Sequence, residues 1–307
     1  MVYTIGEVVL DIIFRTFDNV KVKPGGSMLN TAVSLGRLGV NVSHISTLST
    51  DKASGQLINF LKKNSVQTIF INRTSAIKTS LALAYLDENS NADYTFYKDK
   101  LESSELLKFP DVLNADIIHY GSFFSINEAV HKQLYDFLGK ANKSGCIKLY
   151  DPNFRKPHLA KLKSLMPMVE NNFKMADIVK GSDEDFENIF DVKSGKDTWK
   201  LMKSYGVKVL FYTKGKYGSE LYTDRGVLNI ETKNIKAIST IGAGDTYSAA
   251  IIYFLSSQLT ANNNLSDITI EQWGICINIA HEFSAHTCQS LDNYLSKEYC
   301  DSLLKGE

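Results

Sequence analysis

The segment Ser239–Thr246, with the sequence STIGAGDT, places a turn of small residues and one carboxylate in front of a strongly apolar run. Gly242, Ala243 and Gly244 carry little or no side chain, so their backbone N–H groups can converge on one ligand. The helix predicted to begin near Asp245 adds about half a positive charge at its N-terminus, which favours an anion there. Asp245 can then act as a general base on an alcohol, a role worth about 100- to 10,000-fold in rate. The segment is typical of phosphoryl transfer.

Two other interpretations of this segment stay open at this point. A tight loop whose aspartate caps a helix has the same residues. A dinucleotide-binding turn is a weaker alternative, because Tyr247 stands where the G-x-G-x-x-G pattern needs its third glycine.

Outward from this segment, short apolar runs alternate with stretches of helical periodicity. The runs predict strands at Tyr3–Leu10, Ser43–Leu48, Asp116–Tyr120, Cys146–Tyr150, Ile178–Lys180 and Val207–Thr213. Helices are predicted between them at Met28–Leu38, Gln56–Leu61, Glu128–Ala141, Leu159–Val169 and Thr198–Tyr205. This alternation predicts an α/β fold with a doubly wound, mostly parallel sheet flanked by helices.

Two segments, 12–22 and 78–100, interrupt the alternation. In the second, the apolar run Leu81–Leu86, a polar turn at Asp87–Asn91 and the run Tyr94–Tyr97 predict a β-hairpin. We expect both segments to form a small β lid inserted in one domain that spans residues 1–307. Such a lid keeps a phosphoryl donor away from water until the acceptor alcohol is in place.

Composition and charge exclude several classes of protein. The 307 residues contain 34 Lys and Arg and 34 Asp and Glu, so no net field favours nucleic acid or an anionic membrane as partner. The four cysteines have no metal-site spacing, which predicts reduced thiols. No signal peptide pattern and no run long enough to cross a bilayer are evident. We therefore expect a soluble, cytoplasmic protein.

A second motif, PGGSMLNTA at Pro24–Ala32, runs a glycine pair into an amphipathic helix. Gly25 and Gly26 permit close approach of a polyhydroxylated ligand, and Asn30 can both donate to and accept from a hydroxyl. Asp11, just after the first predicted strand, adds an acceptor for paired hydroxyls. These residues predict a sugar-binding site.

Together, the early Gly25–Asn30 motif and the late Gly242–Asp245 motif resemble the two signatures of the ribokinase-like (PfkB) carbohydrate kinase family. Further segments follow in order along nearly the whole chain: Gly6–Glu7 with Asp11, Thr79–Ala82, Phe96–Tyr97, Asp151–Arg155 and Thr213–Gly218. Among the branches of the family, Thr79–Ala82, Gly121–Ser122 and the DPNFR of Asp151–Arg155 look most like fructokinases.

The resemblance implies an ATP-dependent kinase that phosphorylates a hydroxymethyl group of a sugar. The likeness to the fructokinase branch implies that this sugar is fructose. The family resemblance also implies Asp245 as the base, with Gly242, Ala243 and Gly244 holding the transferring phosphoryl group. The implied sugar-binding residues are Asp11, Gly25, Gly26, Asn30 and Arg155, and the implied nucleotide-binding residues are Thr213, Gly215 and Gly218. Mg²⁺ is expected to arrive with ATP, and a homodimer through the lid strands is plausible from the same resemblance.

Three positions depart from the family pattern. Ser182 and Asp185 stand where the family often has Asn-x-x-Glu, which organises Mg²⁺ through water; Asp185 is the candidate metal residue here. Ser239 stands where many relatives have aspartate, in a region where some members bind an activating potassium ion, so activation by K⁺ stays open.

Alternative functions remain at this point. The acceptor could be ribose, 2-keto-3-deoxygluconate, a sugar phosphate or a nucleoside, since Arg15, Lys21, Lys23, Lys78 and Lys98 could supply a basic pocket. The altered positions 182, 185 and 239 would suit a non-catalytic sugar or nucleotide sensor on the same fold, whereas the intact Asp245 favours the kinase.

Overall fold

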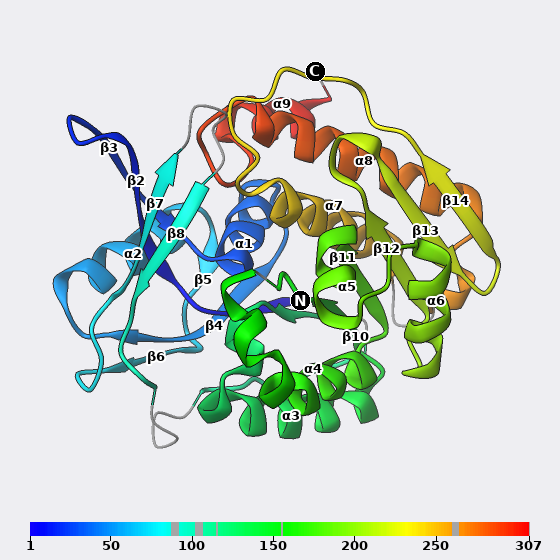
Figure 1. Ribbon diagram of the computed structural model, residues 1–307, viewed down its shortest axis with the longest axis horizontal. Coiled ribbons are helices and arrows are strands. Elements are labelled where there is room, and N and C mark those ends of the chain that lie inside the picture. Colours follow the sequence, from blue (N-terminus) through cyan, green and yellow to red (C-terminus); the bar gives the residue numbers. More distant parts are fainter. Residues whose placement is uncertain (87–91, 102–106, 115, 155, 260–263, 307) are drawn as a thin grey trace. The chain divides into compact units, whose positions relative to one another are not determined.

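The computed structural model describes residues 1–86, 92–101, 107–114, 116–154, 156–259 and 264–306 (Figure 1). The chain forms two compact units. The first unit contains Met1–Pro110, Ile235–Ala249 and Glu282–Glu307, and the second contains Asp111–Asn234 and Ala250–His281. The prediction of a single domain over 1–307 with two lid segments stays a prediction.

The first unit holds a group of parallel strands covered by helices. β1 (Val2–Ile5) pairs with β4 (Val42–Ser49), which also pairs with β5 (Val66–Gln67) and β6 (Ile71–Thr74). Every residue of β4 is buried, as expected for a parallel strand covered on both faces. The helices of this unit include α1 (Ser27–Arg37), which contacts β1 and β4, α2 (Lys52–Lys63) and α9 (Lys297–Lys305).

A separate four-stranded sheet in the first unit confirms the predicted hairpin. Its order is β3 (Asn19–Gly25), β2 (Val9–Thr16), β7 (Ser80–Leu86) and β8 (Ala92–Tyr97). β7 and β8 are antiparallel, as are β2 and β3, whereas β2 and β7 run parallel. We call this the lid sheet. Its residues 87–91, where the polar turn was predicted, lie outside the described residues.

The two faces of the lid sheet differ in burial. Asp11, Ile13, Ala82 and Ala84 point to one face and are buried. The register puts the exposed apolar side chains Val20, Val22, Tyr85 and Tyr97 on the other face. One face thus belongs to the core of the first unit, and the opposite face is apolar and exposed.

The second unit contains four parallel strands followed by an antiparallel pair. β9 (Ile117–Gly121), β10 (Ile147–Asp151), β11 (Ile178–Ser182) and β12 (Val209–Thr213) are parallel. β13 (Ser219–Thr223) and β14 (Gly226–Ile230) extend the sheet in antiparallel order. Helices α3 (Glu128–Ala141), α4 (Leu162–Met175), α5 (Asp183–Phe190) and α6 (Gly195–Ser204) connect the parallel strands, and α3 lies against α4 (Figure 1).

Two long helices, α7 (Ala243–Gln258) and α8 (Ile270–Cys288), have residues in both units. The predicted α/β class with mostly parallel strands flanked by helices is confirmed. Within the described residues, no helix combines the length and the hydropathy needed to span a bilayer.

One strand prediction is wrong. The apolar run Tyr3–Leu10 forms the end of β1 and the start of β2, which belong to different sheets. The chain leaves β1 at Gly6, where a Cβ atom would lie 2.5 Å from Cβ of Met28. The missing side chain at Gly6 lets the chain pass close to α1 as it leaves the first sheet, and a continuous apolar run does not predict this.

Candidate active site

The sugar motif of the sequence forms the start of α1. Gly26 is the N-cap of this helix, and Asn30 in its first turns is only 4% exposed. The Asn30 Nδ2 atom donates to Oδ2 of Asp245 at 2.8 Å. The Oδ1 atom of Asn30 is buried and accepts no hydrogen bond from the described residues. A buried amide oxygen without a donor is costly, by about 1–3 kcal/mol, so this atom is ready to accept from a ligand hydroxyl.

The late glycine motif forms the start of α7, as predicted. Gly242 has a φ of 83°, and a Cβ there would lie 2.2 Å from the carbonyl oxygen of Asn293, so only glycine fits. The Ala243 amide donates to Thr240 O at 3.3 Å. In the described part of the chain, the Gly242 and Gly244 amides find no acceptor, which leaves them available for an anion.

Hydrogen bonds hold both the backbone oxygen and the side-chain carboxylate of Asp245. Thr31 of α1 donates from Oγ1 to the Asp245 backbone oxygen at 3.0 Å, and Asn30 holds the carboxylate. α1 therefore sets both the position and the direction of the candidate base. No sequence pattern indicates this role of Thr31, whose hydroxyl also bonds within its own helix, to Ser27 O at 3.2 Å.

Asp11 lies in β2 on the buried face of the lid sheet and is 6% exposed. A Cβ at Gly25 would lie 2.0 Å from Oδ2 of Asp11, so the glycine makes room for this carboxylate. Burial, followed by the charge of Asp245, raises the pKa of Asp11 to about 7 from 3.8, and a hydrogen bond from Asn293 opposes the rise. A buried carboxyl group whose pKa is raised partly by a second carboxylate, beside unsatisfied polar groups, is typical of a functional site.

The structure thus brings together all the predicted residues of the first unit: Asp11, Gly25, Gly26, Asn30, Gly242, Ala243, Gly244 and Asp245. It adds Asn293, which sequence reasoning missed. The Asn293 Nδ2 atom donates to Oδ2 of Asp11 at 3.0 Å from 282 positions along the chain. No motif marks the segment around Asn293, so only a search for buried polar residues near the C-terminus could have suggested it.

The predicted nucleotide residues lie in the second unit, at the carboxyl end of β12. Thr213 is the last residue of the strand and donates from Oγ1 to Gly181 O at 3.3 Å. Gly215 and Gly218 belong to the loop that follows, which is closed by a 2.8 Å hydrogen bond from Lys214 N to Gly218 O. This compact loop is positioned at the sheet edge where ligands of open α/β sheets bind.

The candidate metal residue Asp185 is used by the protein itself. Its Oδ2 atom accepts from N and Oγ of Ser182 at 2.8 and 2.7 Å, in a capping box at the start of α5. Its Oδ1 atom accepts from Phe154 N at 2.6 Å. Burial, and then the charge of Asp151, raise the pKa of this carboxyl, while Lys180 opposes the rise. Asp185 thereby joins the ends of β10 and β11.

Among the described residues, no group of three His, Cys, Asp or Glu side chains is arranged to hold a metal ion. The role of Asp185 toward Mg²⁺ stays a prediction. Arg155, predicted to bind the sugar, lies outside the described residues.

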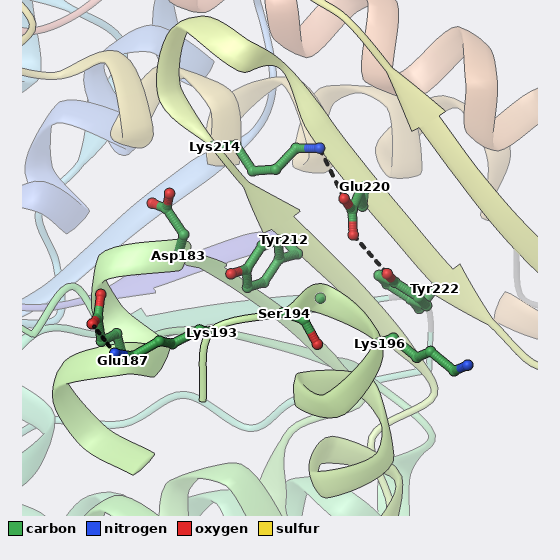
Figure 2. A pocket seen from close by; sticks show the side chains of 10 residues that line it. Asp183, Glu187, Lys193, Ser194, Lys196, Tyr212, Lys214, Glu220 and Tyr222 are labelled. Carbon is green, nitrogen blue, oxygen red and sulfur yellow. Dashed lines mark hydrogen bonds and ion pairs between the residues drawn. The ribbon is translucent and has the colours of Figure 1, made fainter. Parts of the chain in front are cut away.

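Figure 2 shows a cavity of the second unit between α5, α6, β12 and β13, with a volume of about 490 Å³. Lys214 pairs with Glu220 at 2.8 Å, and Lys193 pairs with Glu187 at 3.3 Å, so these charges are balanced within the chain. Tyr212 of β12 lines the cavity; Thr213, the next residue, faces the opposite way by strand alternation. Lys214, the first residue of the predicted nucleotide loop, also lines the cavity, so the two adjoin.

Comparison with known proteins identifies the family. The family model described as pfkB family carbohydrate kinase matches residues 1–295. The chain belongs to this family. It is therefore a phosphotransferase that acts on a sugar hydroxyl.

Relatives within the family include plant proteins. The chain is 29% identical over 236 residues to "Probable fructokinase-3" of Arabidopsis thaliana, covering 75% of this chain and 68% of the plant protein. It is 29% identical over 240 residues to "Fructokinase-2" of Solanum lycopersicum, covering 75% of this chain and 71% of that protein.

Solved structures share the fold at lower identity. A fructokinase from Vibrio cholerae in a form bound to fructose, ADP and calcium ion superposes with a TM-score of 0.85 and 20% identity, covering 99% of this chain and 98% of that one. An aminoimidazole riboside kinase from Salmonella enterica gives a TM-score of 0.84 and 17% identity, with 99% and 98% covered. These likenesses establish the ribokinase-like α/β fold.

Proposed function

We propose that this pfkB family member transfers the γ-phosphate of Mg·ATP to a primary hydroxyl of a monosaccharide, and that the sugar is fructose. The observation that carries the proposal is the Asn30 side chain. Its Nδ2 atom holds the Asp245 carboxylate at 2.8 Å, while its buried Oδ1 atom lacks a donor. A sugar hydroxyl that donates to Oδ1 would be held beside the carboxylate, where a neighbouring hydroxyl could lose its proton.

In the proposed reaction, the primary hydroxyl oxygen attacks the γ-phosphorus of ATP and forms a new O–P bond. The bond from the γ-phosphorus to the bridging oxygen breaks, and ADP leaves with that electron pair. The hydroxyl proton goes to the carboxylate of Asp245. Asp11 accepts from further hydroxyls and fixes the ring.

The N–H groups of Gly242 and Gly244 would stabilise the charge that the transferring phosphoryl group carries. Removing one such donor from a preorganised site typically costs about 100- to 1,000-fold in kcat. Mg²⁺ would enter with the nucleotide and offset the phosphate charge there. We assign Thr213, Gly215 and Gly218 to the nucleotide, Arg155 to the sugar and Asp185 to a water-mediated contact with the metal.

Fructose is favoured over other acceptors by the plant relatives, which are named fructokinases, at 29% identity. The DPNFR segment and Thr79–Ala82 of this chain resemble the corresponding segments of fructokinases, which supports the same branch.

Thr79 also has a structural role. Its hydroxyl and its amide both donate to Asp51, the N-cap of α2. Burial raises the pKa of Asp51, but hydrogen bonds from Ser54, Thr79 and Ser49 outweigh it and hold that pKa below its usual range. This anchor fixes the start of β7.

The exposed face of the lid sheet supports a homodimer. Phe14 stacks on Tyr85 with ring centroids 5.1 Å apart, and Val22 and Tyr97 on the same face are each 57% exposed. An apolar sheet face of this kind is typical of an interface. A second copy of the chain is the occupant we propose. The four cysteines are free thiols, as is usual in the reducing cytoplasm, which supports that location.

A coupled assay of ADP release tests the function. Mg·ATP is offered with fructose, ribose, 2-keto-3-deoxygluconate, fructose phosphates or adenosine, with and without potassium. Faster turnover of fructose than of the other acceptors supports the proposal. Faster turnover of another acceptor would make that compound the proposed substrate instead of fructose. Sugar binding without ADP formation at saturating Mg·ATP would instead support a sensor.

A further inference from the structure

The segment Leu291–Leu295 connects α8 to α9 and bonds to three separate parts of the first unit. Leu295 N donates to Ser34 Oγ at 3.2 Å, and Leu295 O accepts from Arg37 at 2.5 Å, so its end is fixed to α1. Its start and middle reach the lid sheet and the loop before α7. We call Leu291–Leu295 the linking segment.

Lys23 and Asp11 hold consecutive residues of the linking segment. They are direct partners in the antiparallel register of β2 and β3, so their side chains lie on the same face of the lid sheet. Lys23 Nζ donates to Leu291 O at 2.8 Å and forms an ion pair with Asp292. Asp11 accepts from Asn293 at 3.0 Å. One pair of strand positions therefore fixes three residues in a row.

Asn293 also touches the loop proposed to hold the phosphoryl group. The space that a Cβ at Gly242 would need is filled by the backbone oxygen of Asn293, at 2.2 Å. The residue is 1% exposed, and its Oδ1 atom is buried without a donor among the described residues. A single buried residue thus contacts the carboxylate of Asp11 with its side chain and the Gly242 turn with its main chain.

We propose that Asn293 is a positioning residue for the sugar: it holds the Asp11 carboxylate in the orientation that accepts sugar hydroxyls and ties that carboxylate to the Gly242 turn. This inference rests on the proposed function. The amide occupies one lone pair of Oδ2, which fixes the carboxylate plane and leaves the remaining lone pairs for the ligand. Small displacements of such a group are costly, since about 1 Å of misplacement can lower the rate 100-fold.

The ionisable groups around Asp11 determine how the link responds to pH. They are Asp245 on α7, Lys23 opposite on β3, and Asp292 and Tyr294 of the linking segment. Asn293 donates to the ionised form of Asp11 and so lowers its pKa, against burial and Asp245, which raise it. Without Asn293, Asp11 would stay protonated to a higher pH and would lose its capacity as a double acceptor over a wider range.

The test compares Asn293→Ala with Asn172→Ala, a matched control that removes an equally buried asparagine of the second unit. We expect Asn293→Ala to raise the KM for the sugar about 10- to 100-fold, the loss of a charge-assisted hydrogen bond. The KM for ATP should change less than about twofold. The acid limb of kcat/KM for the sugar should move to higher pH, and Asn172→Ala should leave that limb in place. If Asn293→Ala does not fold, Asn293→Ser, which keeps a shorter donor, is measured in the same way and should show a smaller change in the same direction.

A folded variant with the wild-type sugar KM and the wild-type acid limb would overturn the inference. A rise in the KM for sugar, a rise in the KM for ATP and a fall in kcat of similar size would also overturn it, because such a uniform change indicates a structural role alone. If the wild-type protein phosphorylates none of the sugars, the proposed function fails. The hydrogen bond between Asn293 and Asp11 is then tested separately, by the free energy of unfolding measured without sugar. Asn293→Ala should then destabilise the protein more at pH 8 than at pH 5, and an equal effect at both would overturn it.

Discussion

Replacing Asp11 by asparagine should stabilise the folded protein at alkaline pH while weakening sugar binding. Asp11 is 6% exposed, and burial together with Asp245 raises its pKa from 3.8 to about 7. Between these two values the folded chain holds a proton that the unfolded chain has lost. The contribution of Asp11 to stability is thus fully present below pH 3.8 and is lost as the pH rises through about 7.

The size of the effect follows from this shift. Each pKa unit corresponds to about 1.4 kcal/mol, so wild-type protein at pH 8 carries a penalty of about 4 kcal/mol from the ionised, buried carboxylate. At pH 5 the penalty is about 2 kcal/mol. Asn at position 11 carries no charge and can still accept from Asn293. The Asp11→Asn variant should therefore gain up to these amounts.

The free energy of unfolding in urea, measured at pH 5 and pH 8, checks the prediction. The gain of Asp11→Asn over wild type should be larger at pH 8 by about 2–3 kcal/mol. Asp224→Asn is the control, since that side chain is 74% exposed in an ion pair with Lys203. A gain that does not change with pH, or a variant less stable than wild type at pH 8, would refute the reasoning.

Three further predictions concern single positions. Asp245→Asn should lower kcat about 100- to 10,000-fold with the thermal unfolding temperature nearly unchanged, whereas Asp224→Asn should keep wild-type turnover; substantial activity in Asp245→Asn would remove it as the base. Gly242→Ala should lower the free energy of unfolding in urea by about 1–3 kcal/mol more than Gly39→Ala does. Both glycines have a positive φ, but only position 242 lacks space for a Cβ, so equal losses would contradict this. Val22→Asp should shift the protein to monomer in analytical ultracentrifugation, whereas Ile69→Asp should leave the dimer intact, because Ile69 is even more exposed than Val22, at 68% against 57%, but lies outside the lid sheet. A wild-type monomer would disprove the interface.

The sequence predicted elements best where periodicity and capping agree. The predicted helix Glu128–Ala141 has the bounds of α3, which is capped by Asn127 and has a clear apolar stripe. The run Val207–Thr213 begins two residues before β12. The hairpin of β7 and β8 was found from two apolar runs around a polar turn. In each case local residues alone carry the information.

Elements that depend on distant parts of the chain were missed. α5 is a different case, because its capping box of Ser182 and Asp185 is local. An acidic helix start was the alternative interpretation there, but the family pattern made Asp185 the candidate metal residue. The break between β1 and β2 depends on Met28, and Asn293 depends on Asp11 at the other end of the chain. The motifs predicted which residues of the first unit gather at the site, but no local pattern predicts a partner 282 positions away.

The hydrogen bond between Asp11 and Asn293 also bears on synthesis of the chain. A ribosome that adds about 5 to 20 residues per second needs about 15 to 55 s to make the residues between them. During that time β2, β3 and β7 can pair, but Asp11 and Lys23 lack their partners in the linking segment. Gly242 likewise lacks Asn293, which packs against it. All residues of the second unit are made before then. The sugar side of the site should therefore mature later than the second unit, once the linking segment has left the ribosome.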